Sequence, residues 1–219
     1  YYVVGVDVAT GTGSSNSVIS VATAEGVKVA EFVSPHLRPD QLAKQCVAIC
    51  KWFAGLSESG AYLAWEANGP GRVFGDAVRE TGYGNFYYRR NEKSVVSSTS
   101  SVPGWFSTKE EKIALLGQYR KMLTDGTFVN PSRDAVRECR EYVFTQAGGI
   151  VHSRSRSGVD PSGARDNHGD RVIADALCAK LSNGMANPKI SKTADVSPHS
   201  LAFRRQQRIE ANRRKQESW

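Results

Sequence analysis

The sequence of 219 residues carries a net charge of +7 and suits one domain of ordinary size, since two full domains would fit poorly into this length. It holds no run of about 18 or more apolar residues and no basic segment leading into an apolar one, which excludes a membrane-spanning helix and a signal peptide. We therefore expect a soluble, intracellular protein. Because the chain starts at Tyr1 rather than Met, we also expect it to be a piece of a longer protein.

Three Val-rich segments open the chain and predict three successive antiparallel strands. They are residues 2–9, 17–24 and 27–33, separated by Gly-containing turns. An amphipathic helix follows from Pro39 to Gly55, because its apolar side chains recur at helical spacing. The pattern then predicts a strand at 61–66, a short helix between Gly69 and Gly82, and a fifth strand at 86–89.

The second half of the chain predicts a loop, three helices and one hairpin. The loop covers residues 93–104, which are Ser-rich and lack helical periodicity. A capping box with Ser107 or Thr108 as N-cap starts a long helix that ends at Gly126. A further helix at 132–139 leads into a hairpin of 141–145 with 150–152, and the last helix runs from Asp170 to Gly184.

The four cysteines fall within the predicted helices, and we interpret them as reduced core residues. A structural zinc site takes four ligands, and no second pair accompanies Cys46 and Cys50. The other two, Cys139 and Cys178, stand alone in the sequence.

Three carboxylates, Asp7, Glu66 and Asp170, sit where apolar elements begin or end. An unpaired carboxylate in such a place costs several kcal/mol or shifts its pKa, so it is neutralised, hydrogen-bonded or bound to metal. Each acid alone fits a capping or salt-bridge role better than a metal site, whereas the three together indicate a site for divalent metal. Asp175 lies about 140° around the last helix from Asp170, so we do not expect both to face one ion. Asp166 and His168 precede that helix and are auxiliary candidates for metal binding.

The order strand, strand, strand, helix, strand, helix, strand resembles the ribonuclease H-like superfamily. That resemblance implies an α/β fold with a mixed five-stranded sheet, in which three antiparallel strands precede parallel strands and helices flank the sheet. The first and fourth strands of such a sheet are parallel neighbours, so Asp7 and Glu66 are expected to emerge side by side. Open α/β sheets place their ligands at the ends of parallel strands.

Four short motifs, in their order along the chain, resemble the nuclease domain of the large terminase subunit, the motor protein that cuts and packages DNA in tailed bacteriophages and related viruses. They are Gly5-Val6-Asp7-Val8-Ala9, Trp65-Glu66-Ala67-Asn68-Gly69, Gly104-Trp105-Phe106-Ser107-Thr108 and His168-Gly169-Asp170. The resemblance implies a nuclease domain at 1–184, a linker and basic C-terminal tail at 185–219, and an ATPase domain upstream in the full protein.

Carried over residue by residue, the resemblance makes Asp7, Glu66 and Asp170 the catalytic, metal-binding acids. Many members of the family place a second acid just before the last one, where this sequence has Gly169. Whether Asp166 or His168 supplies a further ligand stays open. Asp7 is the best candidate to bridge both ions, because a strand at the centre of the sheet holds its residues most rigidly.

The implied function is a metal-dependent DNA endonuclease that cuts concatemeric viral DNA during genome packaging, in the cytoplasm of the infected host cell. The implied cofactors are two divalent cations, Mg²⁺ or Mn²⁺, about 3.5–4 Å apart, since oxygen ligands select these metals. The expected partners are double-stranded DNA, the ATPase domain of the same protein, the viral portal and the small terminase subunit, with no membrane.

Basic residues are expected to contact the DNA. The candidates for phosphate contacts are Arg89, Arg90, Lys112, Arg154 and Arg156, although each is equally compatible with a solvated surface charge. Residues 199–219 hold six basic and two acidic side chains, a net charge of +4, which suits contact with DNA phosphates or with an acidic surface such as the portal.

Three other functions fit parts of the pattern. Asp7 with Gly11-Thr12-Gly13-Ser14 is similar to the first phosphate loop of sugar kinases and actin-like ATPases, but no matching second loop follows, and the Gly-Lys-Ser/Thr ending of a P-loop is missing. A Holliday-junction resolvase shares the fold and a similar set of acids. A module that binds nucleic acid or portal without catalysis remains the third alternative.

Overall fold

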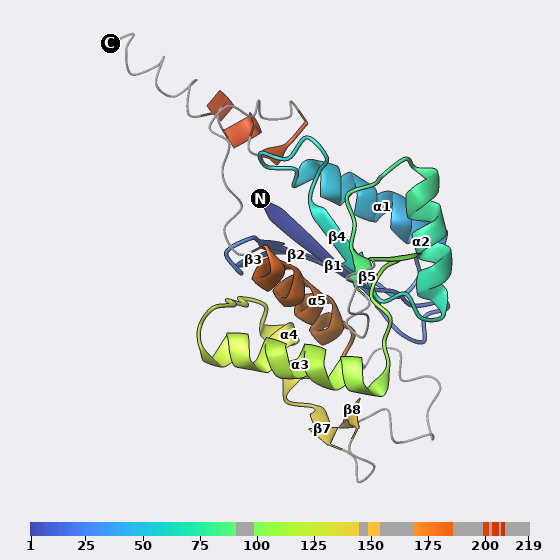
Figure 1. The fold of residues 1–219 in the computed structure, drawn as a ribbon, viewed down its shortest axis with the longest axis vertical. Helices are drawn as coiled ribbons and strands as arrows, with labels where there is room; N and C mark the ends of the chain where they lie inside the picture. Colours follow the sequence, from blue (N-terminus) through green and yellow to red (C-terminus); the bar gives the residue numbers. More distant parts are fainter. Residues whose placement is uncertain are drawn as a thin grey trace.

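The computed structural model describes residues 1–90, 99–144, 149–153, 169–185, 199–201, 203–205 and 207–208. It shows a mixed α/β fold in which helices cover both faces of a central sheet (Figure 1). In the first half of the chain the elements are β1 (Tyr2–Asp7), β2 (Ser17–Thr23), β3 (Lys28–Ser34), α1 (Pro39–Trp52), β4 (Tyr62–Trp65) and α2 (Pro70–Glu80). The second half adds β5 (Tyr88–Arg90), β6 (Thr99–Pro103), α3 (Lys109–Thr124), α4 (Arg133–Cys139), β7 (Tyr142–Phe144), β8 (Ile150–His152) and α5 (Asp170–Gly184).

The central sheet has four strands in the order β3-β2-β1-β4. β2 is antiparallel to both β1 and β3, and β4 runs parallel to β1 with Val6 opposite Trp65. The predicted parallel pairing of the first and fourth strands is therefore confirmed.

The predicted fifth strand of this sheet is not confirmed as a regular strand. Beyond β4, single parallel bridges join Leu63 to Phe86 and Glu66 to Trp105, and the chain between them leaves to form the β5–β6 hairpin. The prediction of a loop at 93–104 is accordingly wrong for Thr99–Pro103, which pair with β5, while residues 93–98 lie outside the described part. The hairpin forms because its backbone groups find partners across the strands, a tertiary pairing that local composition does not encode.

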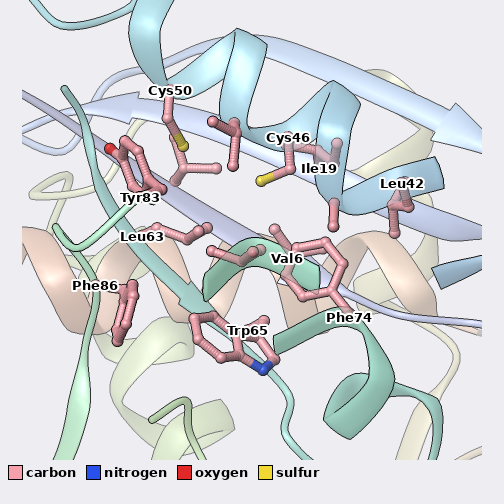
Figure 2. Close-up of a cluster of buried hydrophobic side chains, with 14 of the residues drawn as sticks. Val6, Ile19, Leu42, Cys46, Cys50, Leu63, Trp65, Phe74, Tyr83 and Phe86 are labelled. Atoms are coloured by element: carbon pink, nitrogen blue, oxygen red, sulfur yellow. The ribbon is translucent and has the colours of Figure 1, made fainter. Parts of the chain in front are cut away.

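Two hydrophobic cores lie on opposite faces of the sheet, because successive strand residues point to opposite sides. On one face, Val4 and Val6 of β1 and Trp65 of β4 belong to the core that α1 and α2 cover, and Phe74 of α2 is part of it. Figure 2 shows Val6, Trp65 and Phe74 in this core. Val3 of β1 and Ala64 of β4 belong to the second core, which α3 and α5 cover. Asp7 lies four residues after Val3, and Glu66 lies two residues after Ala64, so strand alternation places both carboxylates on the face of the sheet that α3 and α5 cover.

Helix α5 packs directly on β1, and Gly5 permits the close approach. A Cβ at Gly5 would lie 2.1 Å from the backbone oxygen of Ala174, so no larger residue fits here. Farther along, the Cys178 thiol lies 3.9 Å from the backbone oxygen of Val3. The helix therefore runs antiparallel to β1, and its first residue, Asp170, lies at the end of β1 where Asp7 stands.

The remaining helices and the second hairpin agree with the sequence. Thr108 caps α3 by accepting a hydrogen bond from the backbone N–H of Glu111, and β7 pairs antiparallel with β8 as predicted. The four cysteines are free thiols, and of these Cys139 alone is not fully buried. None of the helices in the described ranges is long and apolar enough to cross a membrane. In the predicted tail, the Arg204 guanidinium lies 4.3 Å from the Trp52 ring of α1.

Candidate active site

The carboxyl ends of β1 and β4 bring Asp7 and Glu66 to the same edge of the sheet. Val6 pairs with Trp65 in the parallel register, and the backbone N–H of Glu66 donates to the backbone oxygen of Val6 at 3.0 Å. Asp7 and Glu66 are the next residues on the two strands and lie on the same face. Asp170 approaches that face as the first residue of α5, where an acid also favours the positive end of the helix dipole.

The three acids share one electrostatic environment. Burial raises the pKa of the Asp7 carboxyl well above its usual range, and the negative charges of Asp170 and Glu66 raise it further. Burial also raises the pKa of Glu66, although Lys112 and a hydrogen bond from the Ser107 side chain oppose that shift. Like charges this close repel each other, so the cluster is an unfavourable arrangement that a cation would stabilise.

Backbone contacts fix the start of α5 and with it the position of Asp170. The backbone N–H of Asn16, in the turn between β1 and β2, donates to Asp170 Oδ2 at 3.0 Å. Gly169 has a φ of 87°, and the Tyr142 hydroxyl donates to its backbone oxygen at 2.9 Å. A Cβ at Gly169 would lie 2.5 Å from the Tyr142 hydroxyl oxygen. The second acid that the sequence resemblance leads one to expect at this position therefore has no room in this chain.

Two acidic side chains, Glu138 and Glu31, hold Arg171, the next residue of the same helix. Glu138 of α4 accepts from the backbone N–H of Arg171 at 3.0 Å and from Arg171 Nη1 at 2.6 Å. On its other side, Arg171 Nε donates to Glu31 of β3 at 2.9 Å. Glu138 is 3% exposed and Arg171 is 13% exposed, so these charge-assisted bonds are shielded from water. Because Arg171 follows Asp170 directly, we expect Glu138 to position the Asp170 carboxylate.

If Asp170 binds metal as the sequence motifs predict, replacing Glu138 by Gln is expected to weaken that binding by roughly 10- to 100-fold, the usual effect of losing a group that orients a metal ligand. The Gln side chain turns an amide donor toward the guanidinium in place of a carboxylate oxygen, so the start of α5 loses one fixed point. The measurement is DNA cleavage titrated with Mn²⁺, in which the half-saturating concentration should rise while the rate at saturation recovers.

Asp134→Asn is the matched control for this prediction, because Asp134 lies on the same helix, exposed and 3.7 Å from Arg137. It should leave the Mn²⁺ titration unchanged. A Glu138→Gln protein that melts earlier but requires no more Mn²⁺ than the wild type would contradict the positioning role.

Ser107 and Asn68 join the segment before α3 to the end of β4. Asn68 Nδ2 donates to the backbone oxygen of Ser107 at 3.0 Å, and the backbone N–H of Ser107 donates to Asn68 Oδ1 at 2.7 Å. This pairing fixes the residue that hydrogen-bonds Glu66. Lys112, one turn into α3, lies 6.0 Å from the centre of the Tyr142 ring, and its charge lowers the pKa of Asp7 and Glu66.

The structure thus places Asp7, Glu66, Asp170 and Lys112 close enough for their charges to affect one another's pKa. It places Asp175 elsewhere, as the helical spacing predicts, in a buried contact with Lys28. Arg89 lies in a neighbouring cleft rather than beside the acids. The other predicted contacts are not described: Arg154, Arg156, Asp166 and His168 lie outside the described residues, as does the side chain of Arg90.

The described part of the chain holds no group of three His, Cys, Asp or Glu side chains already arranged to bind one ion. The three acids are close enough to influence each other's pKa, but their carboxylates are not arranged to bind a single ion. Any contribution from Asp166 or His168 falls outside the described residues.

Sequence reasoning missed several residues that surround the acids. Tyr142 is the most notable, because the charges of Asp7, Asp170, Glu138 and Glu66 add to the effect of burial in raising the pKa of its phenol. In the sequence it is only a strand residue. Glu138 carries a weak signal, since it follows Ala135 by three residues on the buried side of a short helix, where an acid needs a partner.

Neither a protein-family model nor a curated protein matches the chain. Among solved structures, it is similar to the large terminase nuclease from thermophilic phage G20c with bound zinc, with 19% sequence identity and a TM-score of 0.49 over 82% of this chain and 80% of that one. It is also similar to the nuclease domain of the P22 large terminase, with 14% identity and a TM-score of 0.43 over 81% of this chain and 78% of that one. Both proteins belong to the family that the sequence motifs resemble.

Proposed function

We propose that this chain is a metal-dependent DNA endonuclease. Its active site for phosphodiester hydrolysis would consist of Asp7, Glu66 and Asp170. The observation that carries the proposal is the convergence of these acids from two strand ends and a helix start, with the pKa of Asp7 raised by burial and by the other two. An enzyme gains nothing in stability from such repulsion. Clusters of this kind recur at functional sites, where the charges act on a ligand.

The residues present fit a hard divalent cation. In the described part of the chain, no Lys or Arg forms an ion pair with Asp7 or Glu66, so their negative charge is not neutralised by a direct partner. The donors are carboxylate oxygens, which suit Mg²⁺ and Mn²⁺. When bound, two such ions would activate a water molecule and stabilise the leaving 3′ oxygen.

The protein side chains have separate tasks in this proposal. Asp7, on the central strand, would hold the cations together with Glu66 and Asp170. Ser107 keeps Glu66 in place, and the Asn16 backbone does the same for Asp170. Lys112 of α3, whose charge lowers the pKa of Asp7 and Glu66, would contact the scissile phosphate.

The test is cleavage of supercoiled plasmid with Mg²⁺ or Mn²⁺, compared with the same reaction in EDTA. We expect nicked and linear DNA with either metal and none in EDTA, because the carboxylates alone supply no cation to stabilise the departing oxygen. Undiminished cutting in EDTA would contradict a metal-dependent mechanism. A four-way junction tested in parallel separates the resolvase alternative, which predicts that branched DNA is cut far faster than linear duplex.

The biological setting of the proposal is viral genome packaging. Within it, residues 1–184 would form the nuclease domain that cuts concatemeric DNA, and 185–219 a linker and basic tail. The expected partners are double-stranded DNA, an ATPase domain in the full protein, the portal and the small terminase subunit. What supports this setting is the order of the sequence motifs that resemble large terminases.

A further inference from the structure

A cleft of about 540 Å³ opens next to the acids, between α2, the end of β4 and the β5–β6 hairpin. Its floor is Trp65, which glycines contact closely from two sides. A Cβ at Gly75 would lie 2.7 Å from the Trp65 ring, and one at Gly104 would lie 2.9 Å from it. The cleft therefore has an apolar floor, and glycines are required at positions 75 and 104 because any side chain there would clash with Trp65. Its volume is in the range that accommodates a small-molecule ligand or one unit of a polymer.

Three arginines make the rim of this cleft basic. Arg72 and Arg79 project from α2 and Arg89 from β5, against a single acid, Asp76. All three arginines are exposed, and within the described ranges none of them forms a salt bridge. Unpaired guanidinium groups around an apolar floor suit an anion that also carries an apolar part, because the planar fork of Arg matches the geometry of phosphate.

An aromatic ring completes the recognition surface. The Arg89 guanidinium carbon lies 5.8 Å from the centre of the Phe106 ring, and both residues line the cleft. Nucleic-acid bases stack on such aromatic and guanidinium surfaces in proteins that bind single strands. A base within a duplex is already stacked on its neighbours and does not offer its face in this way.

The cleft connects to the acids through two segments. Ala67 lines it and directly follows Glu66, while Phe106 lines it and directly precedes Ser107. Neighbouring residues of an extended segment point to opposite faces, so the cleft and the acids lie on the two sides of the same strand ends. A DNA strand bound at the acids can therefore pass around this edge of the sheet into the cleft.

We infer that this cleft binds an unpaired nucleotide of the DNA strand next to the cleaved bond, with its base on Phe106 and its phosphates on Arg72, Arg79 and Arg89. The inference rests on the proposed function in taking DNA as the polymer. It adds that the enzyme recognises a locally unpaired strand, and it assigns that task to residues that hold no metal.

The test is the binding of a fluorescent 12-residue oligothymidylate in EDTA, measured by anisotropy. Phe106→Ala should raise its Kd roughly 10-fold, as expected from the loss of one stacked base, and should change the Kd for a duplex of equal length less than twofold. The association constant for the oligonucleotide falls with salt, and Arg79→Gln should make this dependence less steep. The slope of its logarithm against the logarithm of the salt concentration should become less negative by about 0.7, as expected for the loss of one phosphate contact with single-stranded DNA.

Two controls make these results specific. Arg120→Gln removes an exposed charge of α3 that does not line the cleft, and it should leave the salt slope unchanged. Phe106→Trp keeps a stacking surface and should bind the oligonucleotide as the wild type does, which separates stacking from a loss of fold. Unchanged oligonucleotide binding by Phe106→Ala would overturn the inference, and so would an equal loss for duplex and single strand.

The outcome is independent of the cleavage test. If the wild type cuts DNA but Phe106→Ala binds single strands normally, the cleft assignment fails and the proposed function stands. If the wild type never cuts but Phe106→Ala loses single-strand binding selectively, the cleft stands and the endonuclease proposal fails. Inorganic phosphate that displaces the oligonucleotide at equal molar concentration would show a simple anion site and would also overturn the inference.

Discussion

Replacing Asp7 by Asn is expected to reduce metal-dependent DNA cleavage by about a thousandfold or more. Asn is nearly the same size but cannot supply a charged oxygen to a cation. Losing a bridging ligand removes several kcal/mol of stabilisation from the transition state, and each 1.4 kcal/mol corresponds to about a factor of ten in rate. The measurement is the initial rate of plasmid nicking at saturating Mn²⁺. The matched control is Asp40→Asn, because Asp40 lies at the start of α1 with a side chain that is 42% exposed.

The same variant is expected to be more stable than the wild type in EDTA. The pKa of Asp7 is raised in the folded protein by burial and by Asp170 and Glu66, so the ionised carboxylate at neutral pH opposes folding. A neutral Asn removes this repulsion, and the melting temperature in EDTA should rise. Mn²⁺ should then stabilise the wild type more than the variant. An Asp7→Asn protein that cuts at the wild-type rate, or one that loses activity only because it unfolds, would contradict the assignment.

Replacing Lys28 by Met is expected to lower the free energy of unfolding by about 3–5 kcal/mol. Lys28 Nζ lies 2.7 Å from Asp175 Oδ1, and the two side chains are 3% and 0% exposed. Ser20 and Asn130 also donate to Asp175, at 2.5 and 2.7 Å, but neither carries a charge. Without Lys28 the Asp175 carboxylate stays buried and loses its counter-charge, which is the costly way to break a buried pair. Urea unfolding followed by circular dichroism measures the loss.

Lys121→Met is the matched control for the buried pair, because it breaks the pair with Asp125 one turn along the exposed face of α3. That change should cost about 0.5 kcal/mol or less. Combining Lys28→Met with Asp175→Asn should recover part of the stability, since the buried charge is then gone. If Lys28→Met and Lys121→Met lowered the free energy of unfolding equally, burial would not make the Lys28–Asp175 pair more important for stability than an exposed pair.

Local patterns were sufficient to predict most of the elements. Val-rich runs between glycine turns and helical spacing predicted β1 to β4, α1, α2 and α5 within a few residues. The capping box at Ser107 or Thr108 predicted the start of α3, and the structure shows Thr108 as the cap. The parallel pairing that sets Asp7 beside Glu66 was implied by the resemblance of the element order to the ribonuclease H-like superfamily. These features depend on neighbours in the sequence or on the topology of a common sheet, which a single sequence carries.

Contacts between distant segments could not be predicted in the same way. The β5–β6 hairpin uses a Ser-rich stretch whose composition favours a loop, and its backbone pairing forms only in the folded chain. The bonds from Glu138 to Arg171 and from Lys28 to Asp175 join residues 33 and 147 positions apart. Local periodicity cannot predict which distant residues pair with each other. It indicates only that an acid on the buried face of a helix has a partner.

Gly169 shows how the structure explains a departure from a family pattern. In the sequence, the glycine stands where many members of the family that the motifs resemble have a second acid, and it leaves open whether Asp166 or His168 supplies a further ligand. In the folded chain the position has a φ of 87°, and the Tyr142 hydroxyl fills the space of a side chain. The glycine is therefore required by its backbone conformation and by Tyr142.

The most direct test of the metal site is a crystal of this protein soaked in Mn²⁺ and measured at a wavelength where manganese scatters anomalously. The proposal predicts an anomalous peak between the carboxylates of Asp7, Glu66 and Asp170, with oxygen atoms of at least two of them in contact with it. A well-ordered site without such a peak, in which the carboxylates remain apart at saturating Mn²⁺, would contradict the proposed chemistry.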